Sequence, residues 1–213
     1  MFKKPLLILL FALIVLTPSS IYANHFLKPI EKNLKTTQDV ITYDEIRDEA
    51  IFNCPWAKKI DKEKEKIVAT LIEIEKKYNL PNELRGMLLA AACHESGYEA
   101  AAQGDFRKKR AMAIGLFQMW PWWEKAYKIN RRDVTPAANA YMKHVRKMYF
   151  KVSNQCKIKN NTKRWLAAWA TAIRAPKKGG RCNERPLFYR VLKKWHSNIR
   201  KSSSYERNKK SGC

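Results

Sequence analysis

The chain has 213 residues and carries 43 Lys and Arg against 19 Asp and Glu, which gives a formal net charge of +24. It contains only seven glycines, so Gly-rich phosphate loops and dinucleotide-binding fingerprints are absent, and cytosolic cofactor enzymes are largely excluded. Hydrophobic residues make up 46% of the chain, which is too many for wholesale disorder. The composition therefore predicts a folded, strongly basic protein.

Residues 1–23 have the pattern of a secretory signal peptide. Two lysines at positions 3 and 4 precede an apolar run from Leu6 to Leu16, and a cleavage-like site follows at 21–23. The apolar run is too short to span a bilayer. We therefore expect a periplasmic or secreted protein. Without residues 1–23 it has about 190 residues, enough for one domain, and a net charge of 41 − 19 = +22.

The cysteine spacing matches no zinc finger or zinc ribbon. The five residues concerned are Cys54, Cys93, Cys156, Cys182 and Cys213. We expect disulfides in an oxidising compartment, with at least one thiol free or bonded to another molecule because the count is odd. Cys156 and Cys182 flank an expected helix and could be paired, whereas Cys93 lies in an apolar run and is expected to be a buried free thiol. Spacing alone leaves the pairing open.

Five segments have the apolar periodicity or the start signals of helices. They begin near residue 60 (ending at 79), at 81 (ending at 97), at 135–136, at 161–162 and near 185 (with an apolar stripe to 199). No strand pattern of comparable strength is present. The sequence predicts a mainly α domain over residues 51–200, preceded by an N-terminal arm at 24–50. A basic tail, expected to be mobile, follows at 201–213.

Glu95 is the most informative residue of the second helix. On an ideal helix it lies within about 20° of Leu84 and Leu88, so it shares their core-facing stripe. Desolvation there and the negative end of the helix dipole near Gly97 both favour the protonated acid. A general acid for glycoside cleavage needs that form near neutral pH. The alternative is a carboxylate at a helix end that points into water and has no chemical role.

A second feature lies downstream, where the segment Gly115–Trp120 places one amide, Gln118, among apolar and aromatic residues. A polar group in such surroundings is typical of a small-molecule cleft. The spacing of His25, His94, His144 and His196 contains no H-E-x-x-H motif. We therefore expect no metal site and no cofactor.

Three motifs in order resemble those of the soluble lytic transglycosylase and goose-type lysozyme family. They are His94-Glu95-Ser96-Gly97, Gly115-Leu116-Phe117-Gln118 and Leu166-Ala167-Ala168-Trp169, and the stretch from Thr135 to Met142 is similar to the helix between the family's second and third motifs. The resemblance covers about residues 80–195. It implies a lysozyme-like helical domain that binds peptidoglycan glycan strands and cleaves the β-1,4 bond between N-acetylmuramic acid and N-acetylglucosamine.

The same resemblance implies roles for individual residues. Glu95 would be the catalytic acid, Ser96 would line the site, and Gln118 would hydrogen-bond substrate. Trp169 stands at the substrate-binding motif where the family has Tyr, and Tyr189 is the nearest candidate for a family Tyr beside the catalytic Glu. We expect Tyr141 to pack in the core instead.

The third motif also departs from the family pattern. Ala170 replaces an Asn that helps grip the N-acetylated sugar, and Ala172 replaces a Gly. An alanine side chain forms no hydrogen bond, so we expect weaker catalysis or a shift toward glycan that lacks the acetyl group.

Whether the chemistry uses one carboxylate or two is open at this point. Inverting and retaining glycosidases need a pair of carboxylates, and Asp105 is the candidate for the second. A loop aspartate more often caps a turn. The family resemblance implies a single-glutamate transglycosylase, with hydrolysis by a lysozyme as the near alternative. A non-catalytic, cationic wall-binding protein on the same fold is a further alternative.

Basic residues are scattered over the whole chain, and the resulting field attracts polyanions. For an exported protein we expect electrostatic contact with anionic wall polymers or a membrane surface. We expect no nucleic-acid partner, because no known nucleic-acid-binding module is recognisable. We expect a monomer.

Overall fold

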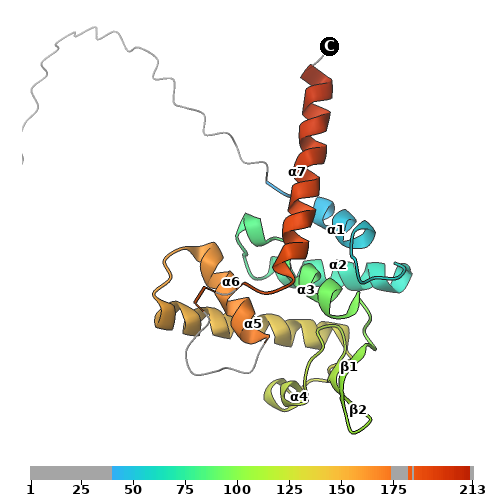
Figure 1. Ribbon diagram of the computed structural model, residues 1–213, viewed down its shortest axis with the longest axis vertical. Helices are drawn as coiled ribbons and strands as arrows, with labels where there is room; N and C mark the ends of the chain where they lie inside the picture. Colours follow the sequence, from blue (N-terminus) through green and yellow to red (C-terminus); the bar gives the residue numbers. More distant parts are fainter. Residues whose placement is uncertain (1–39, 174–181, 184, 212–213) are drawn as a thin grey trace, which may run out of the picture. The chain divides into compact units, whose positions relative to one another are not determined.

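The computed structural model describes residues 40–173, 182–183 and 185–211, and all of them belong to the unit Gln38–Cys213. The fold is mainly α, as predicted: 61% of it is helical, and seven α-helices accompany one two-stranded sheet in the described part of the chain (Figure 1). In chain order the elements are α1 (Tyr43–Phe52), α2 (Lys62–Lys76), the 3-10 helix η1 (Asn82–Leu84), α3 (Met87–Ser96), β1 (Gln103–Arg107), β2 (Arg110–Ile114), α4 (Trp122–Tyr127), α5 (Val134–Cys156), α6 (Asn161–Ala172) and α7 (Tyr189–Ser211).

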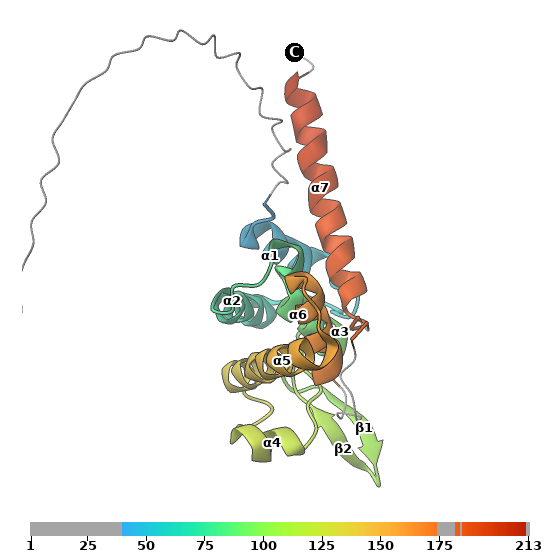
Figure 2. The ribbon, with the colours of Figure 1, turned by 90° about the vertical axis from the view of Figure 1, so that its left-hand side faces the viewer.

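Helix α3 is the centre of the hydrophobic core. Every residue from Met87 to Cys93 is buried, because α1, α2 and α7 all pack against this helix. Helices α5 and α6 pack closely against each other, and the β1–β2 hairpin and α4 lie near one end of α5 (Figures 1 and 2). Glu95 lies in the last turn of this buried helix.

The expected second helix is divided in two. Residues Asn82–Leu84 form η1, and α3 begins only after Gly86. Gly86 has φ of +89°, in the left-handed region that favours glycine, and a Cβ there would meet the side chains of Ile46 and Leu192. The break therefore allows close approach of α1 and α7.

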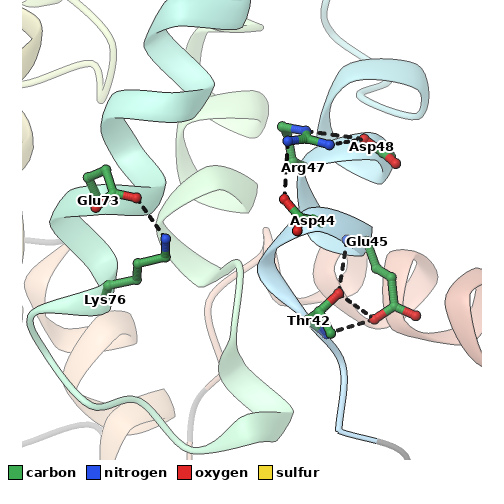
Figure 3. A network of polar contacts seen from close by, with 7 residues as sticks. All are labelled: Thr42, Asp44, Glu45, Arg47, Asp48, Glu73 and Lys76. Carbon is green, nitrogen blue, oxygen red and sulfur yellow. Dashed lines mark hydrogen bonds and ion pairs between the residues drawn. The ribbon is translucent and has the colours of Figure 1, made fainter.

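Helix α1 was not predicted, and the expected boundary at residue 51 falls inside it. Thr42 and Glu45 form a capping box at its start, and Arg47 contacts Asp44 and Asp48 on its surface (Figure 3). Its inner face buries Ile46 in the core. Residues 1–23 and 24–39, expected as signal peptide and arm, lie outside the described residues.

The hairpin and α4 were also missed by the sequence patterns. Strands β1 and β2 pair antiparallel, from Gln103 with Ile114 to Arg107 with Arg110. Lys108 and Lys109 both have positive φ (46° and 64°), whereas such two-residue turns are usually signalled by Asn-Gly or Asp-Gly. Asp105, expected to lie in a loop, is therefore part of a strand.

Two disulfides join four of the five cysteines. Cys156 pairs with Cys182, which confirms that prediction, and Cys54 pairs with Cys93. The prediction that Cys93 is a free thiol was wrong, because the loop after α1 brings Cys54 against α3; Cys213 lies outside the described residues. Two disulfides suggest an oxidising, extracellular or periplasmic environment. None of the helices in the described ranges is long and apolar enough to cross a membrane.

Helix α7 continues further than expected. Its first turns bury Val191, Leu192, Trp195 and Ile199. The residues expected to form a mobile tail, from 201 to 211, continue the helix, whose later turns extend away from the other helices (Figures 1 and 2).

Candidate active site

Glu95 lies in the last turn of α3, beside the loop after α1 that contains Cys54 and Trp56. Gly97 ends the helix in the left-handed region (φ +58°), and it packs so closely on the backbone of Trp56 that no Cβ would fit. The Cys54–Cys93 disulfide holds the same loop against α3. The side chain of Glu95 is 24% exposed, so solvent and a ligand can reach it from one side.

A cleft of about 430 Å³ opens beside Glu95. Its walls are mainly aromatic, and it is lined by Glu95, Asp105, Phe117, Gln118, Trp120, Trp122, Trp123, Tyr141 and Ile173. Three of the residues singled out from the sequence, Glu95, Asp105 and Gln118, therefore meet in one cleft although they come from α3, β1 and the loop after β2. Apolar walls with a few polar groups are typical of a ligand site.

The segment that carries Gln118 is rigidly held. Gln118 has positive φ (46°), its Nε2 donates to the carbonyl of Gly115 at 3.1 Å, and Gly104 leaves room for its amide oxygen. The buried side chain of Arg131 donates through Nη1 to the carbonyls of Met112 (2.8 Å) and Met119 (2.7 Å). Arg131 was not predicted, and nothing in its sequence context distinguishes it from an exposed arginine.

Tyr141 of α5 is a cleft residue as well as a core residue. Its ring stacks on Phe117, with centroids 4.4 Å apart. Burial raises the pKa of the Tyr141 hydroxyl well above its ordinary value; the negative charge of Glu95 raises it further, and the indole of Trp169 lowers it. The expectation that Tyr141 packs in the core agrees with its burial but was incomplete, because Tyr141 also lines the cleft of Glu95.

His94 gives Glu95 a second neighbour. Its Nδ1 lies 3.5 Å from Oε1 of Glu95, and its ring packs edge-on against Trp56 with centroids 4.8 Å apart. A smaller cavity of about 70 Å³ also reaches Glu95, and its lining includes His94 and Ala170. The small side chain of Ala170 therefore borders open space beside the candidate acid.

Three expected site residues lie elsewhere. The Ser96 hydroxyl donates to the carbonyls of Ala92 (3.1 Å) and Leu116 (2.9 Å), so it joins α3 to the loop of Gln118 and does not line either cavity. Trp169 is fully buried beneath the cleft. Tyr189 lines a separate groove on α7 because α7 begins at that residue and directs it away from Glu95.

Asp105 lines the cleft and is hydrogen-bonded there to Trp120, another residue of its lining. It has positive φ (48°) on β1, and its Oδ2 accepts a hydrogen bond from the indole N–H of Trp120. Among the described residues, no group of three or more His, Cys, Asp or Glu side chains could hold a metal ion.

Three comparisons with known proteins add nothing to this geometry. No protein-family model matches the chain, no curated protein matches it, and no solved structure matches it.

Proposed function

We propose that this protein is an exported muramidase that cleaves the β-1,4 bond between N-acetylmuramic acid and N-acetylglucosamine, as a lytic transglycosylase. The observation that carries this proposal is the position of Glu95 in an aromatic-walled cleft of about 430 Å³, with Gln118 beside it. Residues 1–23 would direct export, in agreement with the oxidising environment that two disulfides suggest.

The proposed mechanism uses one acid, Glu95. Protonated Glu95 gives its proton to the glycosidic oxygen, the C1–O bond breaks, and the 2-acetamido oxygen of the substrate bonds to C1. Glu95, now a carboxylate, takes the proton of the C6 hydroxyl while O6 displaces the acetamido oxygen from C1. The product has a 1,6-anhydromuramyl end and no water is consumed.

The chain's own residues support these steps. Gln118 offers amide hydrogen-bonding groups to the sugar, and its backbone is fixed by the Gly115 contact and by Arg131. Exposed and half-buried indoles, Trp122 and Trp120, provide flat apolar faces for sugar rings. Tyr141 lines the same cleft as Glu95, and burial raises the pKa of its hydroxyl.

Mass spectrometry of fragments released from purified peptidoglycan tests the proposal. We expect anhydromuramyl ends from the mature protein and from Glu99→Gln, and none from Glu95→Gln. Glu99 is a matched control because it follows Glu95 by four residues but is exposed and pairs with Lys64 outside the cleft. Reducing ends would identify a lysozyme. Binding to sacculi without soluble products would identify a non-catalytic wall-binding protein.

A further inference from the structure

A second concave surface, unrelated to the cleft of Glu95, lies along α7. It is a groove of about 640 Å³, and seven of its eight lining residues belong to α7. The eighth, Glu83 of η1, is the one carboxylate among them. The proposed cleavage reaction makes no use of this groove.

The groove is strongly cationic. Lys193, Arg200 and Lys201 are exposed, and none of them forms an ion pair with another described residue. Burial lowers the pKa of His196, although the hydrogen bond that its Nε2 donates to the carbonyl of Arg85 at 2.9 Å opposes this, so His196 adds little positive charge to the groove near neutral pH. The groove therefore carries three exposed cations and one carboxylate, that of Glu83.

The polar groups form a line. Lys193, Ser197, Arg200 and Ser204 recur every three or four residues, so they share one face of α7. At 1.5 Å per residue, Lys193 and Lys201 are about 12 Å apart along the axis. Cations spread over about 12 Å, with the hydroxyl of Ser197 between Lys193 and Arg200, suit a chain of phosphates better than one small ion.

We propose that this face of α7 binds a linear phosphodiester polymer of the cell wall with a polyol backbone. A bilayer is a poorer fit, since the apolar residues of α7 face the core and leave no apolar side for insertion. A nucleic acid is a poorer fit too. Tyr189 is the only Phe, Trp or Tyr that lines the groove, and the guanidinium of Arg185 lies over its ring (5.7 Å from the centroid), so the groove has no series of rings on which successive bases could stack.

The test uses the mature protein and poly(glycerol phosphate), with the dissociation constant measured as a function of salt. Lys193→Ala, Arg200→Ala and Lys201→Ala together are expected to weaken binding about tenfold or more and to lower the salt slope by about 2, from about 0.7 per phosphate contact. Lys143→Ala, Lys147→Ala and Lys151→Ala form the matched control. These three exposed lysines have comparable helical spacing on α5, and their replacement removes the same net charge.

The outcome is decisive either way. Equal losses in the two triple variants would mean attraction by net charge alone and would overturn the proposal, as would unchanged binding in the α7 variant. Single-stranded DNA or anionic phospholipid vesicles that bind about tenfold more tightly at equal phosphate concentration would assign the groove to those partners instead. Circular dichroism verifies that both variants fold. Glu95→Gln is expected to bind like the wild type, because the groove does not depend on the cleavage site.

Discussion

The carboxylate of Asp105 accepts a hydrogen bond from the indole N–H of Trp120, with 3.2 Å between Oδ2 and Nε1. The guanidinium of Arg107, from the same strand, lies 4.8 Å from the centre of the Trp120 ring. Two side chains of β1 thus contact this indole: Asp105 at its N–H edge and Arg107 on one face of the ring. Because Trp120 also lines the cleft, we predict that Asp105 orients a wall of the cleft; a role as second catalytic carboxylate is the alternative to be tested.

Substitutions of Asp105 separate these two roles. We expect Asp105→Ala to raise KM about fivefold with little change in kcat, which corresponds to the loss of one hydrogen bond of about 1 kcal/mol. Asp105→Asn is expected to behave like the wild type, because its amide oxygen still accepts from the indole. Steady-state kinetics on soluble glycan strands measure both. An Asp105→Asn variant as inactive as Glu95→Gln would restore Asp105 as a catalytic group.

Ala170 is expected to influence the preference for the substrate's acetyl group. It lines the cavity of about 70 Å³ beside Glu95, where an asparagine side chain has room to enter. We predict that Ala170→Asn raises the turnover of acetylated strands relative to de-N-acetylated strands, since the new amide can hydrogen-bond the acetamido group. Competition between the two kinds of strand measures the ratio. An unchanged ratio would show that position 170 does not contact this group.

Titration of Glu75, which is bonded to the start of α3, should make the stability of the protein depend on pH. This fully buried carboxylate accepts hydrogen bonds from the backbone N–H groups of Gly86 (2.6 Å) and Leu88 (2.7 Å), at the start of the helix that ends with Glu95. Burial raises the pKa of Glu75 to about 7; the two backbone hydrogen bonds, the Tyr43 hydroxyl and the charge of Arg85 oppose the rise. The folded protein therefore holds this proton more tightly than the unfolded chain.

The free energy of unfolding should fall as pH rises from about 4.5 to about 7, because the unfolded chain loses the Glu75 proton first. The decrease from this group amounts to up to about 3 kcal/mol, at about 1.4 kcal/mol per pKa unit. Glu75→Gln resembles the protonated form and should abolish this decrease in the free energy of unfolding. Urea unfolding at several pH values measures the difference between the two proteins. The pKa of His144 is lowered to about 4, so this residue makes the free energy of unfolding rise with pH. This contribution is the same in both proteins and cancels in the difference between them. Parallel curves would contradict the prediction.

The Cys54–Cys93 disulfide should matter for both stability and activity. It closes a loop with a sequence separation of 39 residues, for which chain entropy predicts a stabilisation of about 4 kcal/mol. Cys54→Ala with Cys93→Ala also frees Trp56 from its contact with His94, so we expect a lower kcat. Cys156→Ala with Cys182→Ala is expected to lower the free energy of unfolding without this effect. Urea unfolding and kinetics check both, and equal losses of kcat would contradict the distinction.

Much of the helical framework was predictable from the sequence, because apolar periodicity, Pro and Asn starts and Gly97 are local signals. Helices α2, α5, α6 and the first part of α7 agree with those patterns. The capping box at Thr42 would also have revealed α1. Gly86 divided the second expected helix because two other helices approach it, which no local signal reports. The hairpin turn at Lys108 and Lys109 lacks the usual turn residues.

The sequence by itself determined the mainly α fold, the helix of Glu95 and the Gln118 segment, since each depends on neighbours within a few turns of chain. Only the tertiary structure decided what surrounds Glu95. Tyr141 of α5, 46 positions later in the sequence, lines the same cleft, whereas Tyr189 lines a separate groove on α7. Asp105 meets Trp120 only because β1 and the loop after β2 pack together. Such contacts depend on how whole elements pack, because the free energy that selects them comes from burial of side chains distant in sequence.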